Sequence, residues 1–130
     1  MVSQALRSAA TLRPGARGEQ QACAHLAAHG FEIVERNFRC RSGEIDIIAR
    51  EGQVTVFIEV KQRAGKTHGS GFDAVTLAKR QRIVRAARLF AMLRGLTDSA
   101  LRFDVVVIED DPLRGAVIRH SRSAFDVSGR

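Results

Sequence analysis

Two adjacent stretches of β-forming residues limit most strongly what this chain can fold into. The first runs from Glu44 to Arg50 and the second from Gln53 to Lys61, with only Glu51-Gly52 between them. Alternating apolar and β-branched residues predict strands, and a two-residue connection containing glycine predicts a β-hairpin in which Arg50 lies opposite Gln53. One face of the second strand then carries Val54, Val56, Ile58 and Val60, and the other carries Thr55, Phe57, Glu59 and Lys61.

Helices are predicted before and after this hairpin. Apolar residues at helical spacing indicate one from about Arg17 to His29 and a second from about Val75 to Arg94. Further strands are predicted from Phe31 to Phe38, Leu101 to Glu109 and Ala116 to Ser121. The order α-β-β-β-α-β, with one extra strand, predicts an α/β fold in which helices flank a mixed central sheet.

The length and composition suit one compact domain. The chain has 130 residues, of which 45% are hydrophobic, enough for a single core. We expect residues 17–125 to form this domain. Residues 1–16 are predicted to be a basic, flexible N-terminal arm, and residues 126–130 a short C-terminal tail.

The charge of the chain favours a polyanionic partner. The 21 basic side chains exceed the 14 acidic ones, for a formal net charge of +7, which makes nucleic acid a natural partner. No stretch approaches the roughly eighteen consecutive apolar residues of a membrane span. Cys23 and Cys40 lie far apart without the spacing of a metal site, so we expect free thiols in a reducing compartment, the cytoplasm.

The register of the hairpin decides whether its charged residues can form a site. With a Glu51-Gly52 loop, Asp46 lies opposite Phe57 and diagonal to Glu59 on the same face, about 7–8 Å away at the backbone. Two carboxylates at that separation can converge on one cation, and Lys61 points the same way. A loop longer by one residue would put the carboxylates on opposite faces. The alternative is an exposed sheet face with a simple salt bridge, which the spacing alone favours.

Glu19 adds a third carboxylate to this group. It shares the apolar stripe of the first predicted helix with Ala22, Cys23 and Leu26. Acidic side chains are rarely buried without a partner, and clustered carboxylates repel one another unless a cation offsets their charge. Carboxylate oxygens suit Mg²⁺ or Mn²⁺. Such a cation can polarise a phosphoryl oxygen and acidify a water while a lysine stabilises developing negative charge, which is the chemistry of phosphodiester hydrolysis.

Basic residues recur along the second predicted helix. Lys79, Arg82 and Arg85 are spaced three apart, and Arg63 follows the second strand of the hairpin. These four side chains are predicted to follow a phosphate backbone. The alternative for each of them is an ordinary solvated surface.

Two further acids have competing interpretations. Glu44 shares the predicted face of Asp46, where it could hold a water or a second ion, or form a salt bridge with Lys61. Asp104, in the most apolar strand, could support the site. Pairing with a neighbouring arginine is the favoured interpretation for Asp104.

Motifs spread over most of the chain resemble a known family. They are GEQQACAHLAAHGF at Gly18–Phe31, GEIDIIA at Gly43–Ala49, VFIEVKQR at Val56–Arg63, AVTLAKRQRI at Ala74–Ile83 and RFDVVVIE at Arg102–Glu109. These residues resemble the PD-(D/E)xK nuclease superfamily, whose core is α-β-β-β-α-β. More narrowly, the chain is similar to the YraN family of small bacterial proteins, which is related to Holliday-junction-resolvase-like nucleases.

The resemblance implies a restriction-endonuclease-like fold and a metal-dependent DNA nuclease, with branched or otherwise unusual DNA as a candidate substrate. It implies that Asp46 and Glu59 bind the metal, that Lys61 is the catalytic lysine and that Glu19 assists at the metal. Ile45 stands where the superfamily motif has a proline. Superfamily members can keep the fold and lose catalysis, so the alternative is a non-catalytic nucleic-acid-binding or assembly module. A homodimer stays open.

Overall fold

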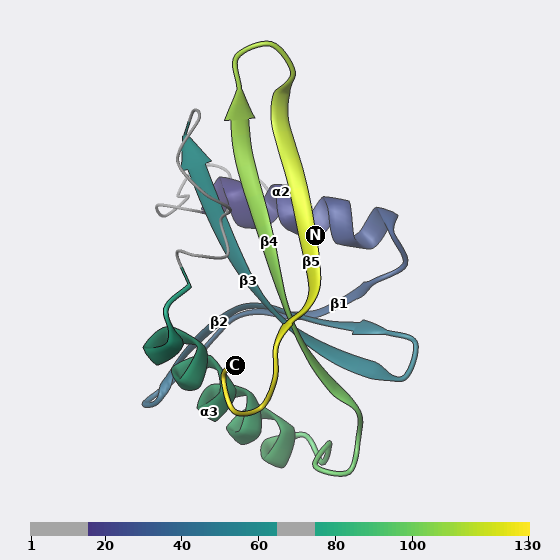
Figure 1. The fold of residues 1–130 in the computed structure, drawn as a ribbon. Helices are drawn as coiled ribbons and strands as arrows, with labels where there is room; N and C mark the ends of the chain where they lie inside the picture. Colours follow the sequence, from purple (N-terminus) through teal and green to yellow (C-terminus); the bar gives the residue numbers. More distant parts are fainter. Residues whose placement is uncertain (1–15, 65–74) are drawn as a thin grey trace.

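The computed structural model describes residues 16–64 and 75–130, and within them it has two helices and a five-stranded sheet (Figure 1). The predicted N-terminal arm lies outside the described residues, apart from Ala16. No helix in the described ranges is long and apolar enough to cross a membrane. In chain order the elements are α2 (Ala16–Ala28), β1 (Glu32–Cys40), β2 (Gly43–Glu51), β3 (Val54–Ala64), α3 (Leu77–Leu93), β4 (Leu101–Asp111) and β5 (Gly115–Phe125).

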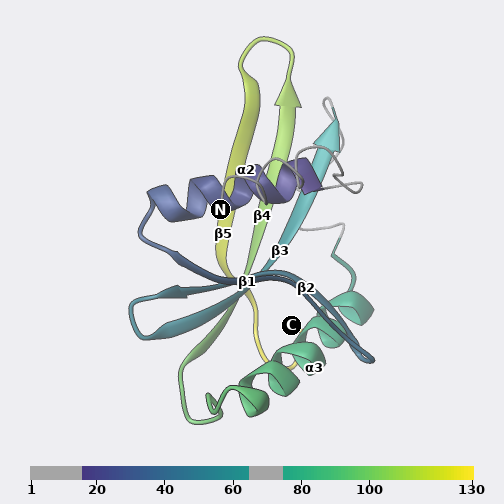
Figure 2. The same ribbon diagram turned by 180° about the vertical axis from the view of Figure 1, so that it is seen from behind.

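The sheet is mixed and has the strand order β1-β2-β3-β4-β5. Only β3 and β4 are parallel neighbours, and α3 lies in the chain between them, because parallel strands need a crossover connection. Figure 2 shows α2 crossing in front of β3, β4 and β5, while α3 lies beside β2. The α/β fold with the expected α-β-β-β-α-β order is therefore confirmed, with β5 as the extra strand.

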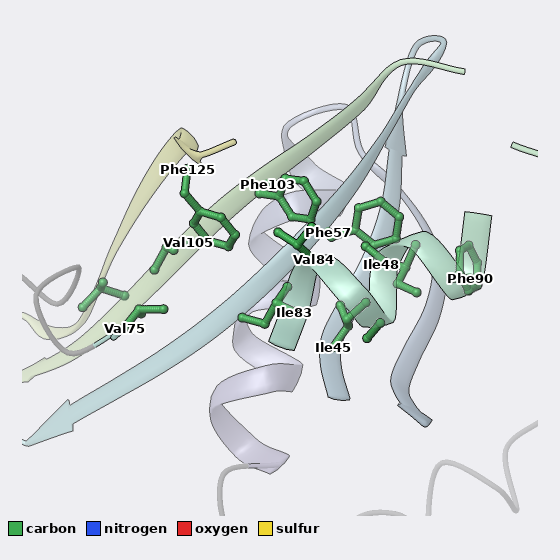
Figure 3. Close-up of a cluster of buried hydrophobic side chains, with 13 residues drawn as sticks. Ile45, Ile48, Phe57, Val75, Ile83, Val84, Phe90, Phe103, Val105 and Phe125 are labelled. Carbon is green, nitrogen blue, oxygen red and sulfur yellow. The ribbon is translucent and has the colours of Figure 1, made fainter. Parts of the chain in front are cut away.

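Two apolar clusters occupy the two sides of the sheet. Along β3, Phe57 contributes to one cluster, and Val56 and Ile58 contribute to the other, as the alternation of the sequence predicts. The α3-side cluster is drawn in Figure 3 and contains Ile45, Ile48, Phe57, Val75, Ile83, Val84, Ala86, Ala87, Phe90, Phe103, Val105, Val107 and Phe125. The α2-side cluster contains Ala22, Leu26, Phe31, Ile47, Ala49, Val56, Ile58, Val106 and Ile108.

The predicted loop of the β2–β3 hairpin is wrong by one position. Glu51 pairs with Val54, so the loop is Gly52-Gln53, and Arg50 pairs with Thr55 instead of Gln53. Gly52 fits the first loop position because its φ is +60°, a conformation that glycine adopts without strain. The pairing shifts by two positions, and a shift of two positions by itself leaves each side chain on its predicted face.

Strand β2 changes the faces of its side chains at Asp46. Ile48 packs in the α3-side cluster, and Ile47 and Ala49 pack in the α2-side cluster, as strict alternation requires. Ile45 should then join Ile47, yet it packs in the α3-side cluster. The alternation of side chains between the two sides of the sheet is therefore interrupted between Ile45 and Ile47.

The alternation of side chains along β1 is interrupted at the same level of the sheet. Phe38 packs edge-on against Phe90 of α3, with ring centroids 5.2 Å apart, whereas Arg36 reaches Glu19 of α2. Asn37 lies between them with φ of 56°, a left-handed conformation that asparagine tolerates better than most residues. As a result, the end of the β1–β2 hairpin is turned towards α3.

Candidate active site

Asp46 and Glu59 meet where strands β2 and β3 part. The last paired residues of this ladder are Ile47 and Ile58, and the next position on each strand is a carboxylate. In place of further pairing, the Val60 N–H donates a 2.8 Å hydrogen bond to Asp46 Oδ2. Asp46 is 8% exposed and Glu59 is 4% exposed. The fold therefore buries two carboxylates side by side at a break in the sheet.

The environment of Asp46 disfavours its charged form. Burial, the charge of Glu59 and a hydrogen bond shared with Glu59 raise the pKa of Asp46 to about 8, against the opposing effect of the Val60 N–H. The charge of Glu19 contributes in the same direction. Near neutral pH the two carboxyl groups can therefore share a proton, a state that a bound cation would replace.

Lys79 forms an ion pair with one of these carboxylates. Its Nζ lies 2.6 Å from Glu59 Oε2, and it projects from the first turn of α3, where its N–H donates to the capping Thr76 hydroxyl at 3.1 Å. Burial lowers the pKa of Lys79, but its hydrogen bond to Glu59 and the charges of Glu59, Asp46 and Glu44 outweigh burial and raise it. The sequence predicted Lys79 as a phosphate contact, whereas the structure places it against Glu59.

Lys61 and Glu19 approach the carboxylates from different elements. Lys61 lies two residues beyond Glu59 on β3, half-buried and on the same side of the strand. Glu19, in the first turn of α2, is 5% exposed, as its place on the apolar stripe predicts. It lies 3.7 Å from Nη2 of Arg36. Glu19 thus belongs to the surroundings of the site but has its own cationic partner.

The donor set fits a hard divalent cation held by two carboxylates. Within residues 16–63 and 75–130, no three acidic, histidine or cysteine side chains stand close enough together to enclose a metal ion. Asp46 and Glu59 converge, and one Asp46 oxygen is already held by the Val60 N–H. Mg²⁺ is commonly bound by only one or two carboxylates, with water and substrate phosphate oxygens completing its shell. Glu19 does not complete a three-carboxylate cage.

The four predicted phosphate contacts lie on α3 and near the end of β3. Lys79 and Arg82 line one pocket between α3 and the end of the β1–β2 hairpin. Arg85 is exposed elsewhere on α3, and Arg63 lies half-buried near the end of β3. Arg39 also lines the pocket, and sequence reasoning missed it because β1 was expected to end at Phe38.

The two remaining acids have different partners. Glu44 pairs with Arg39 across the hairpin, with 3.0 Å between Oε2 and Nε, rather than with Lys61. Asp104 accepts two 2.9 Å hydrogen bonds from Arg102, so the favoured arginine pairing is confirmed. Its carboxylate also contacts His120 at 2.7 Å.

Comparison with known proteins identifies a family. Residues 18–108 match the family described as Uncharacterised protein family UPF0102. A UPF0102 protein of Hahella chejuensis is 50% identical over 93 residues, covering 72% of this chain and 75% of that protein. One from Desulforapulum autotrophicum is 47% identical over 111 residues, covering 84% and 92%. One from Nitrosospira multiformis is 42% identical over 119 residues, covering 91% and 98%. The chain therefore belongs to the uncharacterised family UPF0102, the YraN family that its motifs resemble.

Proposed function

We propose that this protein is a divalent-cation-dependent nuclease that hydrolyses phosphodiester bonds of DNA in the cytoplasm. The observation that carries the proposal is the buried pair of Asp46 and Glu59 at the break between β2 and β3. One lysine faces the pair, and burial and repulsion raise the pKa of Asp46 to about 8. A divalent cation between the two side chains would relieve this repulsion, which explains why the fold would retain a buried pair of carboxylates.

Each side chain of the site has a distinct task in this proposal. Mg²⁺ or Mn²⁺ held by Asp46 and Glu59 would supply Lewis-acid polarisation of a phosphoryl oxygen and acidify a water. The Val60 N–H fixes the orientation of Asp46, and the Lys79 ammonium, 2.6 Å from Glu59 Oε2, fixes the orientation of Glu59. Lys61 provides positive charge beside the reacting phosphate, where it stabilises the negative charge that develops in the transition state.

The basic surface supports DNA as the substrate. The net charge of +7 favours association with a polyanion, and Arg63, Arg82 and Arg85 remain candidate phosphate contacts. Contacts of this kind bind the backbone and carry little sequence information. Branched or otherwise unusual DNA is therefore a reasonable first substrate class, since it differs from duplex DNA in shape.

The ion pair between Lys79 and Glu59 favours a second candidate function. An ammonium 2.6 Å from Glu59 already offsets one of the two buried charges, and a shared proton offsets part of the other. A non-catalytic nucleic-acid-binding or assembly module would have a site of this kind, in which the buried negative charge is offset without a metal ion. Cation binding separates the two functions, because a binding module has no need to hold Mn²⁺ at Asp46 and Glu59.

The first experiment measures Mn²⁺ binding by titration calorimetry. Wild type should bind the cation, and Asp46→Ala should not. Lys61→Ala should retain most of the affinity, since lysine is not a ligand for a hard cation. Glu32→Ala is the matched control, because Glu32 is an exposed β1 acid whose partner is Arg50. Equal binding by wild type and Asp46→Ala would contradict the metal site.

The second experiment measures cleavage of single-stranded, duplex, flap and four-way-junction DNA in Mg²⁺ or Mn²⁺. Wild type should cut at least one of these, and Asp46→Ala should lose about a thousandfold or more in rate. Lys61→Ala should lose much of the rate while keeping its cation. If wild type cuts nothing in the panel, or Asp46→Ala cuts equally well, the nuclease proposal fails and the binding module takes its place.

A further inference from the structure

A pocket of about 410 Å³ opens between the end of the β1–β2 hairpin and the first half of α3. We call it the flanking pocket. Its volume lies in the range of ordinary ligand sites, and it borders the candidate active site because Lys79 contributes to both. Its lining includes Arg39, Cys40, Gly43, Glu44, Lys79 and Arg82.

The flanking pocket is formed by a close contact between the hairpin and the helix. A Cβ added at Gly43 would lie 3.2 Å from both the carbonyl oxygen and the Cβ of Arg82. The carbonyl oxygen belongs to the helix backbone and cannot easily move, so glycine permits the hairpin to rest on α3 at this point. The change of faces at Asn37 and Asp46 turns this end of the hairpin towards the helix. Arg39 on the hairpin and Arg82 on the helix thereby line the same pocket.

The charges of the flanking pocket favour an anion. Three basic side chains line it against one acid, Glu44. Glu44 is paired at 3.0 Å with Nε of Arg39, which holds the guanidinium in place and leaves its terminal nitrogens for another acceptor. For the exposed Arg82, no ion-pair partner is found among the described residues. The first turn of α3 contains no acid, so its positive end is not offset there.

We propose that the flanking pocket binds a backbone phosphate of the DNA strand, adjacent to the phosphate at Asp46 and Glu59. This inference rests on the proposed function and adds to it a subsite with Arg39 and Arg82 as its phosphate ligands. Guanidinium groups suit this task because their forked donors match phosphate oxygens. Lys79 lies between the two positions, so a strand that passes along α3 can occupy both.

Binding of a fluorescein-labelled DNA duplex, measured by fluorescence anisotropy in EDTA over a salt series, tests the subsite. Arg39→Ala/Arg82→Ala should bind roughly tenfold more weakly than wild type, because two phosphate contacts are lost. The slope of log affinity against log salt should fall by about 2 in magnitude. Arg88→Ala/Arg114→Ala is the charge-matched control, since both arginines are exposed and neither lines the pocket. The control should stay close to wild type.

Glu44→Gln gives a second and opposite readout. Removing this acid should strengthen DNA binding or leave it unchanged if the pocket accepts phosphate. Glutamine keeps an oxygen that can accept from Arg39 Nε, so a weaker complex would contradict a phosphate in this pocket and would overturn the inference. The inference also fails if the Arg39→Ala/Arg82→Ala protein behaves like its control, or if wild type binds no duplex at low salt. Thermal unfolding of each variant shows that it is folded.

Failure of the subsite and failure of the nuclease proposal have different results. The binding assay contains no divalent cation, so it does not depend on catalysis. If wild type cleaves DNA but its affinity for DNA does not depend on Arg39 and Arg82, the subsite is wrong and the nuclease proposal stands. If no DNA is cut but binding depends on both arginines, the subsite stands and the nuclease proposal fails.

Discussion

Asp46 on β2 and Asp104 on β4 are both buried, and each accepts a backbone N–H where strand pairing is interrupted. Asp46 Oδ2 accepts from Val60 at 2.8 Å, beyond the last paired residues of β2 and β3. Asp104 Oδ1 accepts from Ser123 at 3.0 Å, where the β4–β5 register shifts and Ser123 has φ of 51°. In both places a carboxylate satisfies a donor that the ladder leaves free.

The surroundings of the two aspartates shift their pKa values in opposite directions. Burial would raise the pKa of Asp104, but hydrogen bonds with His120, Arg102 and the Ser123 N–H outweigh it and lower the pKa. Asp46 instead faces Glu59, and its pKa rises to about 8. A carboxylate whose charge is fully matched stabilises the fold, whereas an unmatched one is retained at a cost in stability and indicates a site for a ligand.

Replacing Asp104 should have the largest effect on stability. Asp104→Ala removes a fully buried carboxylate and leaves Arg102, His120 and the Ser123 N–H without it, which should cost about 3–5 kcal/mol in urea unfolding. Glu32→Ala removes an exposed partner and should cost less than about 0.5 kcal/mol. A loss below about 1 kcal/mol for Asp104→Ala would show that this cluster is not structurally important.

Divalent cation should stabilise the protein through Asp46 and not through Asp104. At a hundredfold excess of Mn²⁺ over its dissociation constant, wild type should gain about 2.7 kcal/mol in unfolding free energy, and chelation should remove the gain. Asp46→Asn should show no gain. The assignment would be wrong if Asp46→Asn responded to Mn²⁺ as wild type does.

Asp46→Asn should itself stabilise the metal-free protein at pH 8, by about 2 kcal/mol or more. An acid whose pKa rises from 3.8 unfolded to about 8 folded destabilises the fold progressively as pH rises through that interval. Asparagine keeps an acceptor for the Val60 N–H and has no charge to bury. The advantage should disappear below about pH 4, where Asp46 is protonated in both states.

Asp104 provides the opposite pH dependence as a control. Its pKa is lowered in the folded state, so its contribution to stability is present above the unfolded pKa and is lost as pH falls through the folded pKa. Urea unfolding of wild type, Asp46→Asn and Asp104→Asn across pH would resolve both slopes. If the contributions of the two aspartates to the unfolding free energy changed in the same direction with pH, their opposite pKa shifts would be wrong.

The smallest expected effect separates the two lysines. Lys79→Met leaves Glu59 buried without its partner and should cost about 1–2 kcal/mol of unfolding free energy at pH 8. The cost is smaller than for a fully buried pair because solvent already screens the exposed part of the Lys79 side chain. Lys61→Met should change stability by less than about 0.5 kcal/mol, because no ion pair joins Lys61 to a described residue. Urea unfolding at pH 8 measures both, and equal losses would show that Lys61 also supports Glu59.

Local patterns in the sequence predicted the elements and the faces of their side chains. Apolar periodicity placed the two helices and five strands of the described residues, and it placed Glu19 on the buried side of α2. Alternation placed Phe57 and Glu59 on one face of β3, because side chains of a strand alternate whatever the strand pairs with. The hairpin loop was misplaced by one residue, since its position depends on the backbone conformation of Gly52.

Only the tertiary structure decided how the charged residues are paired. The break between β2 and β3, the change of faces at Asn37 and Asp46, and the Lys79–Glu59 ion pair depend on contacts between distant segments. The sequence already favoured an arginine partner for Asp104, because Arg102 lies two residues before it, and the predicted hairpin register already brought Asp46 towards Glu59. The tertiary structure added His120 and the Ser123 N–H as partners of Asp104 and Lys79 as the partner of Glu59, and such contacts between distant segments leave no periodic trace in a sequence.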